Sequence, residues 1–131
     1  MELGNISDVI RAGMTYERTR AEVASYNLAM ANIAMQPGDP SPLLRVSIGS
    51  DFASRLALGQ PQLQPHQGHE TRVTHDPSHP LADDKGMVHY PRIEAATEMA
   101  TLVSATRAYE ANIRSYNAMR AMTLKAFEIG K

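Results

Sequence analysis

Apolar residues recur every three or four positions in two long segments, one near each end of the chain. In the first segment the series runs Val9, Ala12, Tyr16, Thr19, Val23, Tyr26, Met30 and Ile33. In the second it runs Met99, Leu102, Thr106, Tyr109, Ile113, Tyr116, Arg120, Thr123 and Phe127. Steps of this size place side chains on one face of an α-helix and are typical of a heptad seam. The pattern predicts long helices within residues 1–36 and 92–131.

Proline and histidine are confined to the segment between these helices. All eight prolines and all five histidines lie within residues 37–91. Because proline interrupts the hydrogen bonds of a helix, residues 37–91 are predicted to form a broken insert. Asn5 is the expected N-cap of the first helix, which we expect to end at the sequence QPGD, residues 36–39. The predicted fold is mainly α, a single structural unit in which two long terminal helices pair as an antiparallel coiled coil around a short irregular or β insert.

The insert contains two β-prone stretches separated by polar sequence. These stretches are LLRVSI, residues 43–48, and TRVTH, residues 71–75. Residues 59–70 are rich in Gln, Pro and Gly and have little to bury, which predicts a mobile loop. We therefore expect two or three short strands among turns.

Both helices contain the tripeptide S-Y-N followed by alanines and methionines, at residues 25–35 and 115–126. Alanine lets a neighbouring backbone come close, and methionine fills irregular gaps. Tyr26 and Tyr116 each carry a hydroxyl group that needs a partner, and a polar residue near a seam can fix register, as expected for Asn27, Asn112 and Asn117. Two long helices with a polar insert cannot enclose a spherical core, so we infer that other chains complete the fold.

Composition narrows the possible partners and reactions. The 13 basic and 14 acidic residues are intermixed, so nucleic acid is not an expected partner, and cysteine is absent. The chain contains no run of about 18 apolar residues and no cleaved secretory signal, so direct membrane insertion is not expected. It also has no nucleophile-elbow, Walker or dinucleotide motif, which argues against an enzyme with a small-molecule substrate. The adjacent Asp83 and Asp84 are expected to cap a turn.

The histidines raise the possibility of a metal site. His66, His69, His75, His79 and His89 lie close together in the sequence, and His66 and His69 have the spacing of a ligand pair. Against this hypothesis, the pair falls in the predicted mobile loop and no cysteine accompanies it. We therefore expect no metal and no cofactor.

The C-terminal half resembles a known family on specific motifs. Residues 79–88, HPLADDKGMV, and residues 90–130 are similar to the proximal rod proteins of the bacterial flagellar basal body, of the FlgC type. Three motifs carry the resemblance: Pro80, Leu81, Ala82, Asp83, Gly86 and Val88; Pro91, Ile93, Glu94, Glu98 and Met99; and Ser104, Ala105, Arg107, Tyr109, Ala111 and Asn112. Near the end of the first helix, Asn27, Leu28, Ala29 and Ala31 fit the motif of axial flagellar proteins, whereas Tyr26 and Met30 depart from it.

The resemblance implies a structural role. Such proteins leave the cell through the flagellar type III apparatus without a cleaved signal and polymerise through their terminal helices. The rod that they form in the periplasm transmits torque and encloses the export channel. Implied partners are copies of the chain, other rod proteins, the membrane ring and the export apparatus. The expected assembly interface comprises Val23, Tyr26, Asn27, Leu28, Met30, Ile33, Met99, Leu102, Arg107, Tyr109, Asn112, Ile113, Tyr116, Asn117 and Leu124.

Two other classes stay open at this point. One is a free-standing coiled-coil adaptor or regulator, which would be a stable helical dimer when purified. The other is a small metal-binding or enzymatic module, which would keep its fold without the terminal helices.

Overall fold

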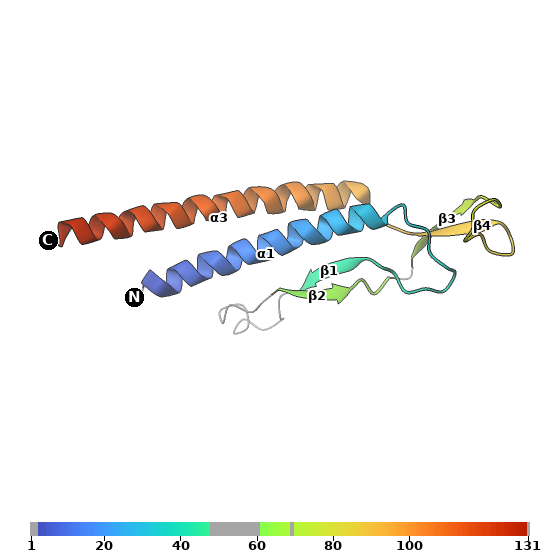
Figure 1. Ribbon diagram of the computed structural model, residues 1–131, viewed down its shortest axis with the longest axis horizontal. Coiled ribbons are helices and arrows are strands. Elements are labelled where there is room, and N and C mark those ends of the chain that lie inside the picture. The colour runs from blue at the N-terminus through green and yellow to red at the C-terminus, as the bar shows by residue number, and fades with distance from the viewer. Residues whose placement is uncertain (1–2, 48–60, 69, 131) are drawn as a thin grey trace.

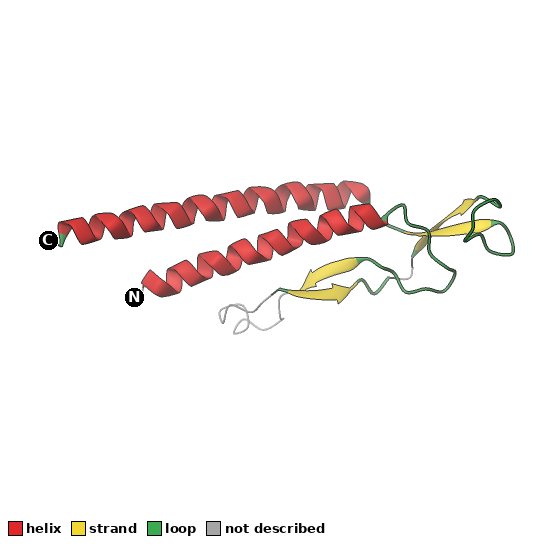
Figure 2. Cartoon of the chain, viewed as in Figure 1, coloured by secondary structure: helices red, strands yellow, loops and turns green. Residues whose placement is uncertain are grey.

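The computed structural model describes residues 3–47, 61–68 and 70–130. Its elements follow the order α1 (Leu3–Met30), β1 (Leu44–Ser47), β2 (Gln62–Pro65), β3 (Thr71–His75), β4 (Met87–Pro91) and α3 (Ala95–Ile129). Figures 1 and 2 show an elongated molecule in which the two helices lie side by side. The β1–β2 sheet lies along α1, and the β3–β4 sheet extends beyond the ends of the helices (Figure 1).

The prediction of two long terminal helices packed together is confirmed. The helices are antiparallel, because Arg11 near the start of α1 contacts Tyr116 in the C-terminal half of α3. α3 has 35 residues and α1 has 28, and the last turns of α3 extend past the start of α1 (Figure 1). Part of α3 therefore has no partner within its own chain.

Both predicted ends of the first helix are wrong by several residues. α1 begins at Leu3, so Asn5 lies inside the helix, and α1 ends at Met30, before residues 36–39. The early end has a tertiary cause. The backbone N–H of Met35 donates to the His89 carbonyl at 2.8 Å, in an antiparallel bridge to β4. The chain must leave the helix before Met35 to make this contact.

Small residues form the surface on which the two helices meet. Ala24 and Ala105 have an exposed fraction of 0%. A methyl group added to Gly13 would lie 3.1 Å from Asn112 Nδ2, so the α1 backbone approaches α3 closely there. The least exposed positions of α3 recur every three or four residues and include Glu98, Thr101, Ala105, Ala108, Asn112, Tyr116, Met119 and Thr123. The seam is therefore rotated around α3 relative to the series that contains Met99 and Ile113.

Val23 is the member of the predicted apolar series of α1 that is buried beside the insert, whereas Val9, Tyr26 and Ile33 of that series are exposed. Val23 is buried, with 8% of its surface exposed, and lines a cavity together with Leu44 and Val46 of β1. Ala24 follows Val23 in sequence, and successive helical residues point about 100° apart. The helix thus presents Val23 to the β1–β2 sheet and Ala24 to α3.

The β1–β2 sheet is held to α1 by the side chain of Asn27. Asn27 is buried, with 4% of its surface exposed. Its Nδ2 donates to the Leu44 carbonyl at 3.0 Å, and its Oδ1 accepts from the Leu44 N–H at 2.9 Å. The amide therefore pairs with both backbone polar groups of one strand residue, as a neighbouring strand would. Because unpaired buried amides are costly, the pairing anchors β1.

The prediction of a mobile loop over residues 59–70 is wrong for residues 62–65, which form β2. β2 pairs antiparallel with β1, with Leu44 opposite Pro65 and Ser47 opposite Gln62. Proline is tolerated because Pro65 ends the strand and β2 is an edge strand. Residues 59, 60 and 69 of the predicted loop lie outside the described residues.

β3 and β4 form a separate hairpin, with Thr71 opposite Pro91 and His75 opposite Met87. The strand predicted over residues 71–75 is confirmed, and Val88 and Pro91 of β4 are fully buried. Asp83 organises the turn between these strands, because its Oδ1 accepts from the backbone N–H groups of Lys85 and Met87, each at 2.9 Å. The predicted capping role is thus confirmed for Asp83.

Acid is expected to loosen this turn. The Met87 N–H is the main cause that lowers the pKa of the Asp83 carboxyl below its ordinary value of 3.8, and the His89 ring and the Lys85 N–H lower it further. A carboxyl with a lowered pKa stabilises the folded hairpin above pH 3.8, and this stabilisation is lost as the pH falls through the folded pKa. We expect the protection of the Met87 amide, its intrinsic exchange rate divided by its observed rate, to fall as the pH drops below 3.8 in native protein. Asp83→Ala should lack this protection at every pH, whereas Asp84→Asn should behave as native; an Asp83→Ala variant that matches native protein would contradict this role.

Candidate assembly interface

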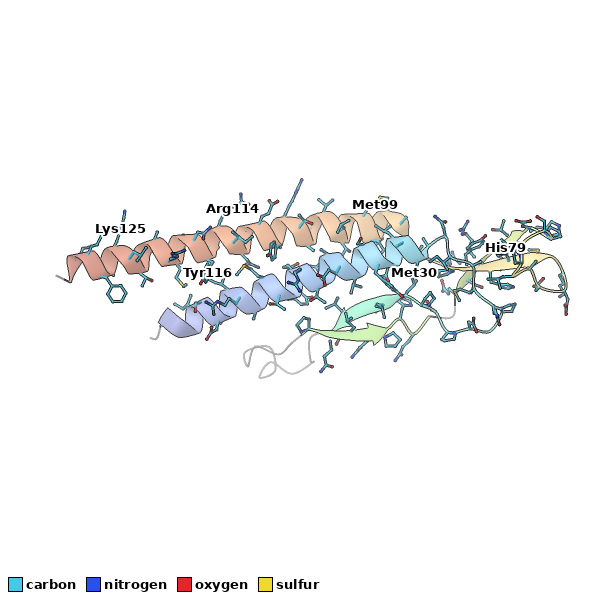
Figure 3. All side chains as sticks on the ribbon, in the orientation of Figure 1. Met30, His79, Met99, Arg114, Tyr116 and Lys125 are labelled. Atoms are coloured by element: carbon cyan, nitrogen blue, oxygen red, sulfur yellow. The ribbon has the colours of Figure 1, made fainter. Side chains whose placement is uncertain are left out.

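A second row of apolar side chains on α3 is not covered by α1. It consists of Met99, Val103, Ile113 and Leu124, which we call the outer stripe. Their exposed fractions are 57%, 52%, 36% and 56%. At about 100° per residue, these positions lie about 80–160° around the helix from Ala105 in the seam. Figure 3 shows Met99 and Arg114 on the side of α3 away from α1, whereas Tyr116 points toward α1.

The exposed apolar surface continues to the end of α3. Met122, Phe127 and Ile129 are 65%, 71% and 86% exposed. Single exposed apolar residues are ordinary on protein surfaces, but four large ones on one face of a helix, with three more in its last turns, indicate a surface for another chain. The isolated chain thus leaves large apolar side chains in water while Ala24 and Ala105 are buried between its own helices.

Arg11 and Tyr116 connect the helices at the start of α1. Arg11 Nη2 donates to the Tyr116 hydroxyl oxygen at 3.1 Å, and the guanidinium lies 5.6 Å from the ring centroid. This hydrogen bond lowers the pKa of the Tyr116 hydroxyl and raises the pKa of Arg11. Tyr116 was expected to need a hydrogen-bond partner for its hydroxyl group, and it finds one within the same chain. The contact is exposed, so it fixes register more than it adds stability.

The structure sorts the predicted interface residues into three groups by exposure. Val23 and Asn27 are buried within the chain. Leu28, Met30, Leu102, Tyr109, Asn112 and Tyr116 are partly buried. Tyr26, Ile33, Met99, Arg107, Ile113, Asn117 and Leu124 are exposed. The exposed group is the one available to another chain, and three of its members, Met99, Ile113 and Leu124, belong to the outer stripe.

The alanines of both helices were expected to allow close packing, and Ala24 and Ala105 are fully buried. Gly13, Ala24 and Ala105 were not part of the predicted assembly interface, because a hydrophobicity pattern gives small residues little weight. Their signal was the spacing of small residues at helical intervals, 11 positions from Gly13 to Ala24, which corresponds to about three turns.

The metal hypothesis gains no support. Within residues 3–47, 61–68 and 70–130, no group of three or more His, Cys, Asp or Glu side chains is placed to hold a metal ion. His66 Nδ1 accepts from the Gly68 N–H, His79 Nδ1 accepts from the Leu81 N–H, and His89 contacts Asp83 at 3.3 Å. His69 lies outside the described residues. The described histidines that make contacts thus organise local turns.

In the parts of the chain that are described, neither helix is long and apolar enough to cross a membrane. Long paired helices with an uncovered apolar stripe define a class of protein, the elongated helical subunit that packs against further chains.

Comparison with known proteins identifies the family within this class. The family described as flagellar basal body rod FlgEFG protein C-terminal matches residues 85–129. The flagellar basal-body rod protein FlgC of Salmonella typhimurium is 33% identical, and that of Escherichia coli O6:H1 is 31% identical, each over the full length of both chains. FlgC of Bacillus subtilis is 32% identical over 95% of each chain. The chain belongs to the FlgC family of flagellar basal-body rod proteins, which are structural proteins of the rod and not enzymes.

Proposed function

We propose that this chain forms part of the proximal rod, the axial shaft that transmits torque and surrounds the export channel. The outer stripe is the observation that carries the proposal, because its apolar side chains remain in water until another helix covers them. Fully burying such a side chain is worth about 1.5–3 kcal/mol. Because 36–57% of each stripe residue is still exposed, covering it contributes roughly half of this value, and the four residues together favour assembly.

The partners follow from this role. Copies of the chain and other rod subunits cover the outer stripe and the C-terminal turns of α3, while the membrane ring and the export apparatus lie at the base of the rod. The exposed members of the predicted interface, including Tyr26, Ile33, Arg107 and Asn117, contact these neighbours. Residues 1–36, 37–91 and 92–131 act as one structural unit in the rod.

The chain reaches the periplasm through the flagellar type III apparatus without a cleaved signal. Its lack of cysteine suits this route, since no disulfide has to be reduced before the unfolded chain is threaded through a channel. The α1–α3 seam includes small and polar residues such as Gly13, Ala24, Ala105 and Asn112, which suits a pairing that must open for export.

Deletion of the chain tests the proposal. A strain that lacks it should assemble no rod beyond the membrane ring and should not swim, and the wild-type gene should restore both. Electron microscopy of isolated basal bodies and a soft-agar assay measure the two effects. Complete rods and normal swimming in the deletion strain would contradict the proposal.

A further inference from the structure

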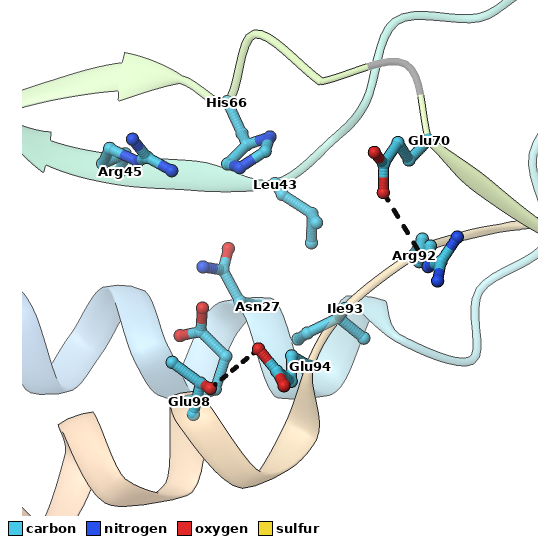
Figure 4. Close-up of a pocket in the computed structure, with 10 residues that line it drawn as sticks. Asn27, Leu43, Arg45, His66, Glu70, Arg92, Ile93, Glu94 and Glu98 are labelled. Atoms are coloured by element: carbon cyan, nitrogen blue, oxygen red, sulfur yellow. Dashed lines mark hydrogen bonds and ion pairs between the residues drawn. The ribbon is translucent and has the colours of Figure 1, made fainter.

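A cleft separates the β1–β2 hairpin from the start of α3, and Figure 4 shows its walls. Its volume is about 630 Å³. Since a water molecule occupies about 30 Å³ of liquid, the cleft has room for several side chains from another molecule. The lining residues are Asn27, Leu43, Arg45, His66, Glu70, Arg92, Ile93, Glu94, Thr97 and Glu98.

Opposite charges face each other across this cleft. Arg45 and His66 project from the hairpin, and Glu94 and Glu98 project from the start of α3 (Figure 4). Glu94 accepts a hydrogen bond from the Thr97 hydroxyl at 3.0 Å. Among the described residues, neither the Arg45 nor the Glu98 side chain has a salt-bridge or hydrogen-bond partner, although Glu98 is partly buried. The cleft thus offers one free cation and one free anion.

The turn between β3 and β4 carries the complementary pair. Asp84 and Lys85 are adjacent and exposed, and within the described residues their side chains have no partner. The hairpin that bears them projects from the end of the molecule (Figure 1). Its shape is fixed beforehand by the bonds to Asp83 and by Gly86, whose φ of +73° favours glycine. A rigid charged turn loses little entropy when it docks.

We propose that the β3–β4 turn of one copy docks in the cleft of a second copy, where Asp84 pairs with Arg45 and Lys85 with Glu98. The surface that projects differs from the surface that receives it, so the contact is head-to-tail and repeats around a ring or along a helical array. This inference rests on the proposed function, because copies meet in this way only when the subunits assemble. It adds a polar contact that is separate from the outer stripe.

Site-directed crosslinking in the assembled rod tests the contact. The chain has no cysteine, so two introduced cysteines are the only thiols that it carries. One tagged copy carries Arg45→Cys and a differently tagged copy carries Asp84→Cys, both in the deletion strain. A short bis-maleimide is the reagent, because an Arg–Asp pair holds its Cα atoms further apart than the roughly 4.4–6.8 Å of a disulfide.

The expected result is a dimer that carries both tags in isolated basal bodies. The control replaces Asp84→Cys with Arg114→Cys, an exposed position on α3, and should give no dimer with Arg45→Cys. Absence of the Arg45–Asp84 dimer in rods that contain both variants would overturn the contact and leave the proposed function intact. A crosslink from Arg45→Cys to a different rod protein would show that this protein, and not a second copy of the chain, occupies the cleft. That result would overturn the proposal.

If the cysteine variants do not enter the rod, reversing the charges of the paired residues tests the contact instead. Arg45→Glu should reduce incorporation, and Asp84→Arg in the same chain should restore it, because every contact between copies then regains opposite charges. Restoration by Glu98→Arg instead would mean that Arg45 and Glu98 pair within one chain, which would overturn the proposal. Failure of either second change to restore incorporation would overturn it as well.

Discussion

Lysine at two positions of the outer stripe is expected to remove the chain from the rod while the isolated chain keeps its helices. In Ile113→Lys/Leu124→Lys both substituted positions are exposed in the single chain, so each should change the free energy of folding by no more than about 0.5 kcal/mol. In the rod each lysine would replace a buried apolar group worth about 1.5–3 kcal/mol. Together they should reduce incorporation by more than about 100-fold, at about 1.4 kcal/mol per tenfold.

Quantitative immunoblotting of isolated basal bodies measures this loss, and circular dichroism of the purified variant checks its helix content. Ser115→Lys is the control, because Ser115 is exposed on the same helix and lies about 160° around the helix from the centre of the stripe. It should retain more incorporation than the double variant. Native incorporation of Ile113→Lys/Leu124→Lys would show that the stripe faces solvent in the rod.

Overpacking the seam should have the second largest effect. Ala105 is fully buried where α3 faces α1, so Ala105→Leu must push the helices apart or force strained rotamers. Such changes cost about 1–3 kcal/mol, a large share of the stability of a chain whose seam is made of small residues. The midpoint of urea unfolding, followed by circular dichroism at 222 nm in native protein and variant, measures the loss.

Ala111→Leu is the control for the seam, because Ala111 is exposed on the same helix and gains the same atoms. Its unfolding midpoint should stay near the native value. An Ala105→Leu variant with an unchanged midpoint would mean that the helices do not pack at Ala105 in solution.

The sequence was sufficient to predict the helices but not the faces on which they meet. Proline placement and apolar spacing act locally, and they located α1 and α3 to within a few residues. Heptad spacing gives the large apolar Val23 and Ile113 more weight than Ala24 and Ala105. Periodicity shows that a face is apolar, but it does not show whether the same chain or another chain covers it.

The insert was harder to predict, because its second strand and its contact with Asn27 depend on pairing that exists only in the folded chain. β2 is rich in Gln and Pro and has no intrinsic strand signal, because it forms by pairing with β1. Asn27 was expected at an interface between chains, whereas its amide binds the Leu44 backbone within the chain. The side chain of a buried asparagine finds its partner only in the folded structure, so its sequence context gave no indication of this role.

A density map of isolated basal bodies, at a resolution that shows side chains, tests the central claim most directly. A helix from a neighbouring subunit should cover Met99, Ile113 and Leu124, while Ala24 and Ala105 stay buried between the two helices of one chain. A map in which the outer stripe borders solvent, or in which Ala105 packs against a different subunit, would contradict the account.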